Sequence, residues 1–140
     1  MKSLLFLLAF TLSTSLFAQE SWKISHNGKQ RLQTSIENEA QNVISIKRNA
    51  LKKKGQLWIY RVVPEEQKGW NKTITLVDSK DTELAQSTSN SYKVTNAKLT
   101  ALFKKASTIK VYYSAVPSDP ELASRIRVRR VHLCTIRLEP

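Results

Sequence analysis

The sequence predicts a mainly β protein, an antiparallel β-sandwich of the immunoglobulin-like or jelly-roll-like kind, with one short α-helix near residues 96–105. Two observations predict this class. Runs that alternate apolar and polar residues recur about every 8–12 residues, and polar turn residues separate them. Only one stretch shows apolar residues at the three- and four-residue spacing of an amphipathic helix. The pattern therefore favours two packed sheets with one helix added to them.

The N-terminal segment 1–18 has the layout of a secretory signal peptide. Lys2 supplies a short positive region, an apolar region covers residues 4–12, and cleavage is expected after Ala18. The remaining residues, 19–140, have the length of one domain and contain no stretch apolar enough to span a membrane. We therefore expect an exported protein, either periplasmic or extracellular, made of a single β-sandwich domain.

The first strands follow from turn chemistry. Asn27-Gly28 lies between alternating runs at 22–26 and 29–36, and this dipeptide favours a two-residue hairpin because both turn positions need positive φ. A third strand is expected at 42–47. Another is expected at 56–63, and its apolar residues on both faces are typical of a strand inside a sheet.

Residues 48–55 allow two interpretations. Asn49 could cap one helical turn that Gly55 ends, or the segment could be a plain solvated turn. It contains the densest lysine run of the chain, Lys52-Lys53-Lys54. We interpret this run as a solvated turn in preference to a binding site.

The C-terminal half adds strands, one helix and a connection. Thr95 or Asn96 can cap the helix, and Leu99, Leu102 and Phe103 lie at its core-facing spacing. The helix is expected to cover one end or edge of the sandwich. A short helical connection is expected after Pro120, which suits a first helical turn. The predicted strands of this half are 72–77, 82–86, 91–94 and 108–116.

The last stretch, 125–138, has the longest alternating pattern of the chain and is predicted to be one long strand, the spine of the domain. Its middle breaks the alternation, since Arg130 and His132 fall on the apolar side. Either a central strand covered on both faces or a bulge near Arg129-Arg130 would explain this.

The net charge of +12 favours anionic partners. On one strand face, Arg125, Arg127 and Arg129 would lie about 7 Å apart and could follow a row of phosphates or sulfates. Trp70, in a polar loop, is the aromatic residue expected to be exposed for stacking on a ligand. We rank an anionic glycan, lipopolysaccharide or a protein partner ahead of nucleic acid.

Two alternatives to this binding site remain open. The three arginines could instead pair with acidic residues of the same sheet, and the positive charge could serve solubility without any specific ligand. The acidic residues considered as partners are Glu37, Glu39 and Asp119.

The residues that could support catalysis or bind a metal are few. His132 and Cys134 share a strand face, but no second pair completes a zinc site, and His26 lies beside a turn. We expect a buried, unreactive thiol beside a hydrogen-bonded histidine, with no metal, cofactor or catalytic residue. The alternative is a small accessory enzyme in which Arg130 and His132 activate the Cys134 thiol.

Four stretches of the C-terminal half carry a resemblance: Asn96–Leu99, Thr108–Tyr112, Pro117–Ala123 and Val128–Thr135. Together with the signal peptide ending in Phe17-Ala18-Gln19, they resemble a group of short exported, functionally uncharacterised proteins of Bacteroidetes-type bacteria. The resemblance implies a Gram-negative exported protein and assigns no functional residue. The sequence thus predicts a non-enzymatic binding module of the cell envelope; a structural subunit of a surface assembly is a further alternative.

Overall fold

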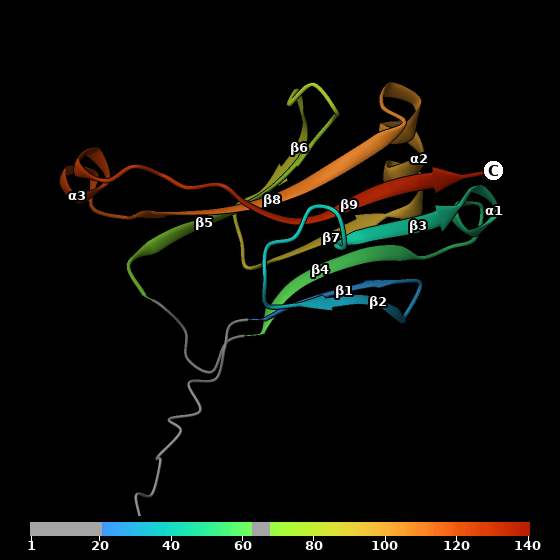
Figure 1. Cartoon of the computed structure of the whole chain (residues 1–140), viewed down its shortest axis with the longest axis horizontal. Coiled ribbons are helices and arrows are strands. Elements are labelled where there is room, and N and C mark those ends of the chain that lie inside the picture. The colour runs from blue at the N-terminus through green and yellow to red at the C-terminus, as the bar shows by residue number, and fades with distance from the viewer. Residues whose placement is uncertain (1–20, 63–67) are drawn as a thin grey trace, which may run out of the picture.

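The computed structural model describes residues 21–62 and 68–140. Within these ranges, two sheets pack face to face, as predicted, and enclose the core (Figure 1). The first sheet has the order β2-β1-β4-β7, and the second has the order β3-β9-β8-β5-β6. The strands are β1 (Ser21–His26), β2 (Lys29–Thr34), β3 (Val43–Lys47), β4 (Gln56–Val62), β5 (Trp70–Val77), β6 (Glu83–Ser87), β7 (Ser91–Thr95), β8 (Thr108–Pro117) and β9 (Val131–Glu139).

In the described residues, all but one of the strand pairs are antiparallel. β3 pairs in parallel with β9, with Val43 opposite Thr135 and Lys47 opposite Glu139. The chain leaves the first sheet after β2 and crosses to the edge of the second, so β3 enters beside β9 in the same direction. The second sheet is therefore mixed, where the sequence predicted antiparallel pairing.

The predicted hairpin at Asn27-Gly28 is confirmed. Asn27 has φ 52° and Gly28 has φ 79°, the positive values that a tight two-residue turn between twisted strands requires. In β1, Trp22, Ile24 and His26 are buried, and the residues between them are only half-buried. The alternating pattern therefore reports the inward face correctly here.

The core lies between the inner faces of the two sheets. Its centre consists of aliphatic side chains with no exposed surface, and this dry layer supplies most of the favourable free energy of folding. These residues are Ile24, Leu57, Ile59, Ile74, Leu76, Val94, Leu99, Ile109, Val111 and Ile136.

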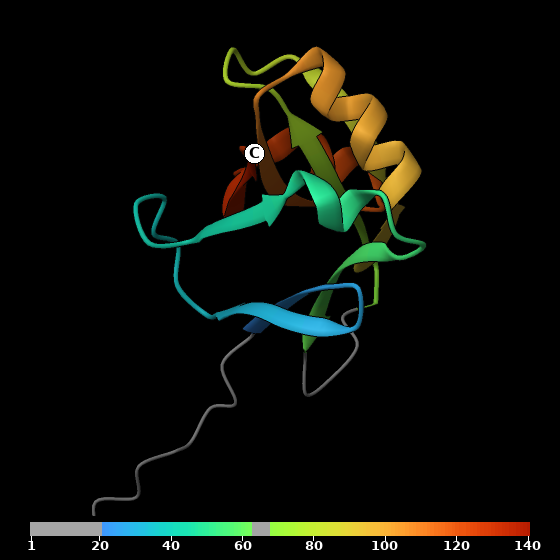
Figure 2. The same cartoon turned by 90° about the vertical axis from the view of Figure 1, so that its right-hand side faces the viewer.

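Three short helices complete the described structure: α1 (Arg48–Leu51), α2 (Asn96–Lys105) and α3 (Pro120–Arg125). The Thr95 hydroxyl caps α2 by accepting from the Lys98 amide, and Leu99 and Leu102 pack into the core as predicted. α1 and α2 contact each other at one end of the sandwich, and α3 lies at the opposite end (Figure 1). Figure 2 views the molecule from the α1–α2 end.

The prediction of one strand over 125–138 is wrong in its first part. Arg125 ends α3, residues 126–130 lie outside any sheet, and β9 begins only at Val131. The partner strand explains the boundary, because the pairing of β8 with β9 ends at Tyr113 opposite Val131. Beyond that point β8 pairs only with β5, so the alternating residues 126–130 find no neighbouring strand.

The prediction that the middle of this strand is covered on both faces is confirmed for residues 132–136, whereas Arg130 lies outside the strand and is exposed. Residues 132–136 of β9 are all buried, since the strand lies between β3 and β8 and is covered on both faces. The irregularity in register lies in β8 between Val111 and Tyr112, however, and not near Arg129-Arg130. No helix in the described part of the chain is long and apolar enough to cross a membrane.

Candidate functional site

The three predicted arginines do not form a row. Arg125 is the last residue of α3, and its guanidinium lies 2.5 Å from the Glu121 carboxylate one helical turn earlier. Arg127 and Arg129 lie in the exposed segment that precedes β9. The expected spacing of about 7 Å along one strand face is therefore a wrong prediction, because these residues are not in a strand.

Arg129 confirms the alternative hypothesis from the sequence, in which the arginines pair with acidic residues of the protein. Its guanidinium lies 2.5 Å from one oxygen of Glu37, and the other oxygen of Glu37 accepts the backbone N–H of His132 at 3.0 Å. Glu37 thus fixes the entry to β9 and neutralises the arginine. Two of the three predicted arginines already have a carboxylate partner within the chain.

Trp70 is exposed, as the sequence indicated, with 42% of its surface accessible. It is the first residue of β5 and not part of a loop, and it lies opposite Pro117 of β8. Pro117 is the last residue of β8, three residues before α3 begins, so Trp70 lies at the α3 end of the molecule. The remainder of the predicted loop before Trp70 falls partly outside the described residues.

The Cys134 thiol is buried, which confirms the interpretation as a packed core residue. It has no exposed surface, and burial raises the pKa of the Cys134 thiol far above its usual range. A thiol that stays protonated is a poor nucleophile and a poor metal ligand. Across residues 21–62 and 68–140, no group of three or more His, Cys, Asp or Glu side chains is placed to hold a metal ion.

His132 is buried and hydrogen-bonded, as predicted. Its Nε2 lies 2.9 Å from the Thr135 hydroxyl, and its ring meets the Tyr112 ring edge-on at 5.5 Å. Burial lowers the pKa of His132, against a smaller opposing influence of Glu39 and Glu37. Arg130 lies over Tyr112 at 3.9 Å and pairs with Asp81 at 3.1 Å, so none of these groups is arranged to activate Cys134.

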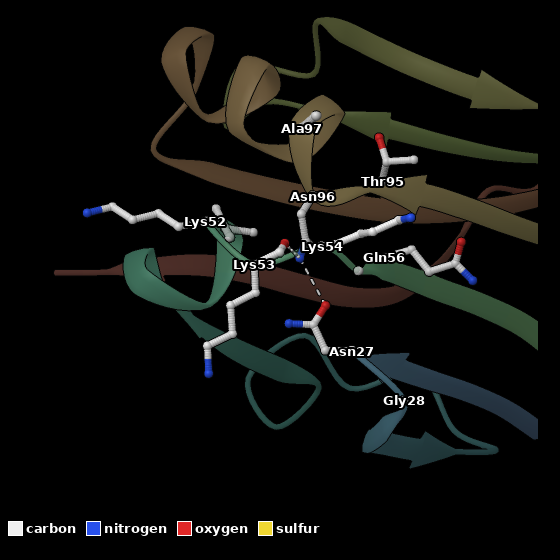
Figure 3. A pocket seen from close by; sticks show the side chains of 11 residues that line it. Asn27, Gly28, Lys52, Lys53, Lys54, Gln56, Thr95, Asn96 and Ala97 are labelled. Atoms are coloured by element: carbon white, nitrogen blue, oxygen red, sulfur yellow. Dashed lines mark hydrogen bonds between the residues drawn. The ribbon is translucent and has the colours of Figure 1, made fainter.

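A cleft lies at the α1–α2 end of the sandwich, opposite α3. It is lined by the lysine run that we interpreted from the sequence as a solvated turn. The cleft has a volume of about 730 Å³. It lies where the Asn27-Gly28 hairpin, the turn after α1 and the start of α2 meet (Figure 3). Lys52, Lys53 and Lys54 line it, and no carboxylate from residues 21–62 or 68–140 does.

A buried amide fixes the backbone of this turn. Asn96, only 2% exposed, donates through Nδ2 to the Lys53 carbonyl at 2.8 Å, to the Ala50 carbonyl at 3.3 Å and to Asn27 Oδ1 at 2.9 Å. The backbone N–H of Asn96 also donates to the Gly55 carbonyl at 3.0 Å. The first residue of α2 thus holds both sides of the lysine turn.

The same contacts determine which role the His26 ring nitrogen Nε2 takes in its hydrogen bond to Asn96. Because two carbonyls face Nδ2 of Asn96, its Oδ1 must face His26 Nε2, which lies 2.9 Å away. Nε2 of His26 therefore carries the proton and donates. Gly55 completes the arrangement, since a Cβ there would overlap the Asn27 side-chain oxygen.

The electrostatics of the cleft follow from this geometry. Figure 3 shows the three lysine side chains spreading outward from the turn in different directions, with the Asn96–Asn27 hydrogen bond beside the turn. The amino end of α2 faces the same cleft and adds partial positive charge. Glu139 lies opposite Lys47 in register but does not line the cleft. The lysine turn therefore gives this end of the molecule a local positive charge.

Sequence reasoning noted the lysine run but did not predict the cleft that it lines. The three adjacent lysines are the feature of the sequence that points to this cleft. Their interpretation as a turn is correct, since residues 52–54 form the turn after α1. Asn96 gave no signal, because an asparagine at the start of a helix is explained by capping alone. Comparisons with protein-family models, with curated proteins and with solved structures find no match for this chain.

Proposed function

We propose that this protein is an exported, non-enzymatic binding module for an anionic glycan or another polyanion, and that it binds through the lysine cleft. The observation that carries the proposal is the carboxylate-free cleft lined by Lys52, Lys53 and Lys54. Among the described residues, no ion pair involves these lysines, whereas Arg125, Arg129 and Arg130 each have a carboxylate partner.

The physical basis of the proposal is local charge density. Three adjacent lysines on a turn with a fixed backbone attract an anionic polymer without first having to neutralise a neighbouring carboxylate. Salt screens such contacts, because charges on the surface separated by more than about 8–10 Å interact weakly at physiological ionic strength. Binding through the cleft should therefore weaken steeply as salt is added.

The test is retention on immobilised heparin during a salt gradient. One variant replaces Lys52, Lys53 and Lys54 with serine, and a matched control replaces Arg125, Arg127 and Arg129 with serine. Both remove three positive charges, so a difference between them reports position and not net charge. We expect the lysine variant to elute at clearly lower salt and the arginine variant to elute close to the wild type.

Two results would contradict the proposal. If both variants elute at equally reduced salt concentrations, the positive charge acts diffusely over the surface. If the arginine variant elutes at lower salt than the lysine variant, the binding site lies at the α3 end. The competing hypothesis of an enzyme centred on Cys134 gains no support from a thiol with no exposed surface. A structural subunit that accepts a strand at a sheet edge would self-associate, which gel filtration measures.

A further inference from the structure

A second cavity adjoins the lysine cleft and has a different character. It is a groove of about 620 Å³ between α1, α2 and the end of β9. This volume lies in the range of about 300–1,000 Å³ found for small-molecule sites. Apolar side chains form much of its wall: Leu51 is buried, and Phe103 and Leu138 are half-buried against the core.

The polar part of the groove wall is almost entirely basic. Arg48, Lys52 and Lys104 line it together with Thr100, and no carboxylate in the described part of the chain does. Lys105 lies beside it, in a smaller hollow of about 250 Å³ that Arg48 and Lys104 also line. An apolar trough with basic side chains along it is complementary to a molecule that has a hydrocarbon chain and an acidic end.

The groove and the lysine cleft are adjacent. Leu51, Lys52 and Ala97 line both cavities. One ligand molecule could therefore place an apolar chain in the groove and its acidic headgroup against the lysines of the cleft. A polysaccharide without a lipid chain would leave the apolar side chains of the groove uncovered.

We propose that the ligand is a single anionic lipid, with its acyl chain in the α1–α2 groove and its phosphate-bearing or sugar-phosphate headgroup at the lysine cleft. This inference rests on the proposed function and names the class of polyanion. The groove supplies affinity through buried methylene groups, each worth roughly fourfold when fully covered. The basic side chains select against neutral lipids of the same chain length.

The probe is dodecyl phosphate, held below its micelle-forming concentration and titrated into the full mature domain by calorimetry. Inorganic phosphate tests the headgroup without a chain, octyl phosphate tests a shorter chain, and dodecyl maltoside tests the same chain with a neutral head. We expect dodecyl phosphate to bind at least tenfold more tightly than each of the three comparison compounds.

Two tryptophan substitutions on α2 locate the chain. Thr100→Trp fills the groove, and Ala101→Trp adds the same side chain at the next exposed position, which does not line it. We expect Thr100→Trp to weaken dodecyl phosphate binding at least tenfold with unchanged elution from heparin, and Ala101→Trp to resemble the wild type. Phe103→Ala removes part of the apolar wall and serves as a second variant if circular dichroism shows that Thr100→Trp does not fold.

The outcomes separate the two proposals. Wild-type affinity of the folded groove variants, or equal affinity for dodecyl phosphate and dodecyl maltoside, would overturn the lipid inference while leaving heparin binding through the cleft intact. Loss of dodecyl phosphate binding in Thr100→Trp, together with unchanged heparin elution of the lysine variant, would support the acyl chain in the groove but reject the proposed function and the placement of the headgroup at the lysine cleft.

Discussion

Replacing Asn96 with alanine tests the idea that a buried amide holds the lysine turn. The side chain is 2% exposed and makes four hydrogen bonds, to His26, Asn27 and the carbonyls of Ala50 and Lys53. The Ala50 carbonyl keeps a second donor, Asn27 Nδ2 at 3.3 Å. In the Asn96→Ala variant, the Lys53 carbonyl and His26 Nε2 lose their hydrogen bonds to the Asn96 side chain.

The magnitude follows from these two groups. Leaving a buried polar group without a partner costs about 1–3 kcal/mol, and the cleft lets water reach part of the site. We therefore expect Asn96→Ala to lower the free energy of unfolding by about 3 kcal/mol. For a domain of this size, the melting temperature should fall by about 10 °C.

The assay is urea denaturation followed by tryptophan fluorescence, with Asn49→Ala as the control. Asn49 is an exposed residue of the neighbouring helix α1, so its replacement should change the free energy of unfolding by less than about 0.5 kcal/mol. Equal, small effects of the two substitutions would refute the reasoning, because the Asn96 contacts would then contribute nothing to stability.

Three further predictions concern the end of the sheet around β9. Cys134 should react with a thiol reagent at least about 100-fold more slowly in the native protein than in urea, because reaction requires exposure of a buried thiol; a fast native reaction would contradict its burial. The lowered pKa of His132 means that the unfolded chain binds more protons below its usual pKa of about 6.5, so stability should fall as pH drops from 7 towards 5. His132→Gln should reduce the dependence of stability on pH between 7 and 5. An unchanged dependence would mean that other titrating groups cause it. Arg129→Ala should cost less than about 1 kcal/mol because the pair is exposed, while Glu37→Ala should cost more, since Glu37 also accepts the His132 N–H; the reverse order in urea denaturation would exclude this role of Glu37.

Features determined by neighbouring residues were predictable from the sequence. The Asn27-Gly28 hairpin depends on the φ angles of two adjacent residues, and α2 depends on a cap and on the spacing of Leu99 and Leu102. Burial at the middle of β9 was also visible, because the alternation breaks where the strand is covered on both faces.

Features that depend on distant partners were not predictable. Alternation over 125–130 satisfies the pattern of a strand, but a strand also needs a neighbour, and β8 pairs with β5 alone beyond Tyr113. The lysine cleft likewise depends on a contact between Asn96 and the turn 43 residues earlier. No local pattern in the sequence reports that contact.

The most direct test of the central claim is to map where a polyanion binds. Amide chemical shifts of the ¹⁵N-labelled domain would be followed during titration with a short heparin oligosaccharide. The account predicts shift changes concentrated at residues 48–55 and 95–105, with few at 125–130. Changes concentrated at 125–130 and Trp70, or spread evenly over the surface, would contradict the assignment of binding to the lysine cleft.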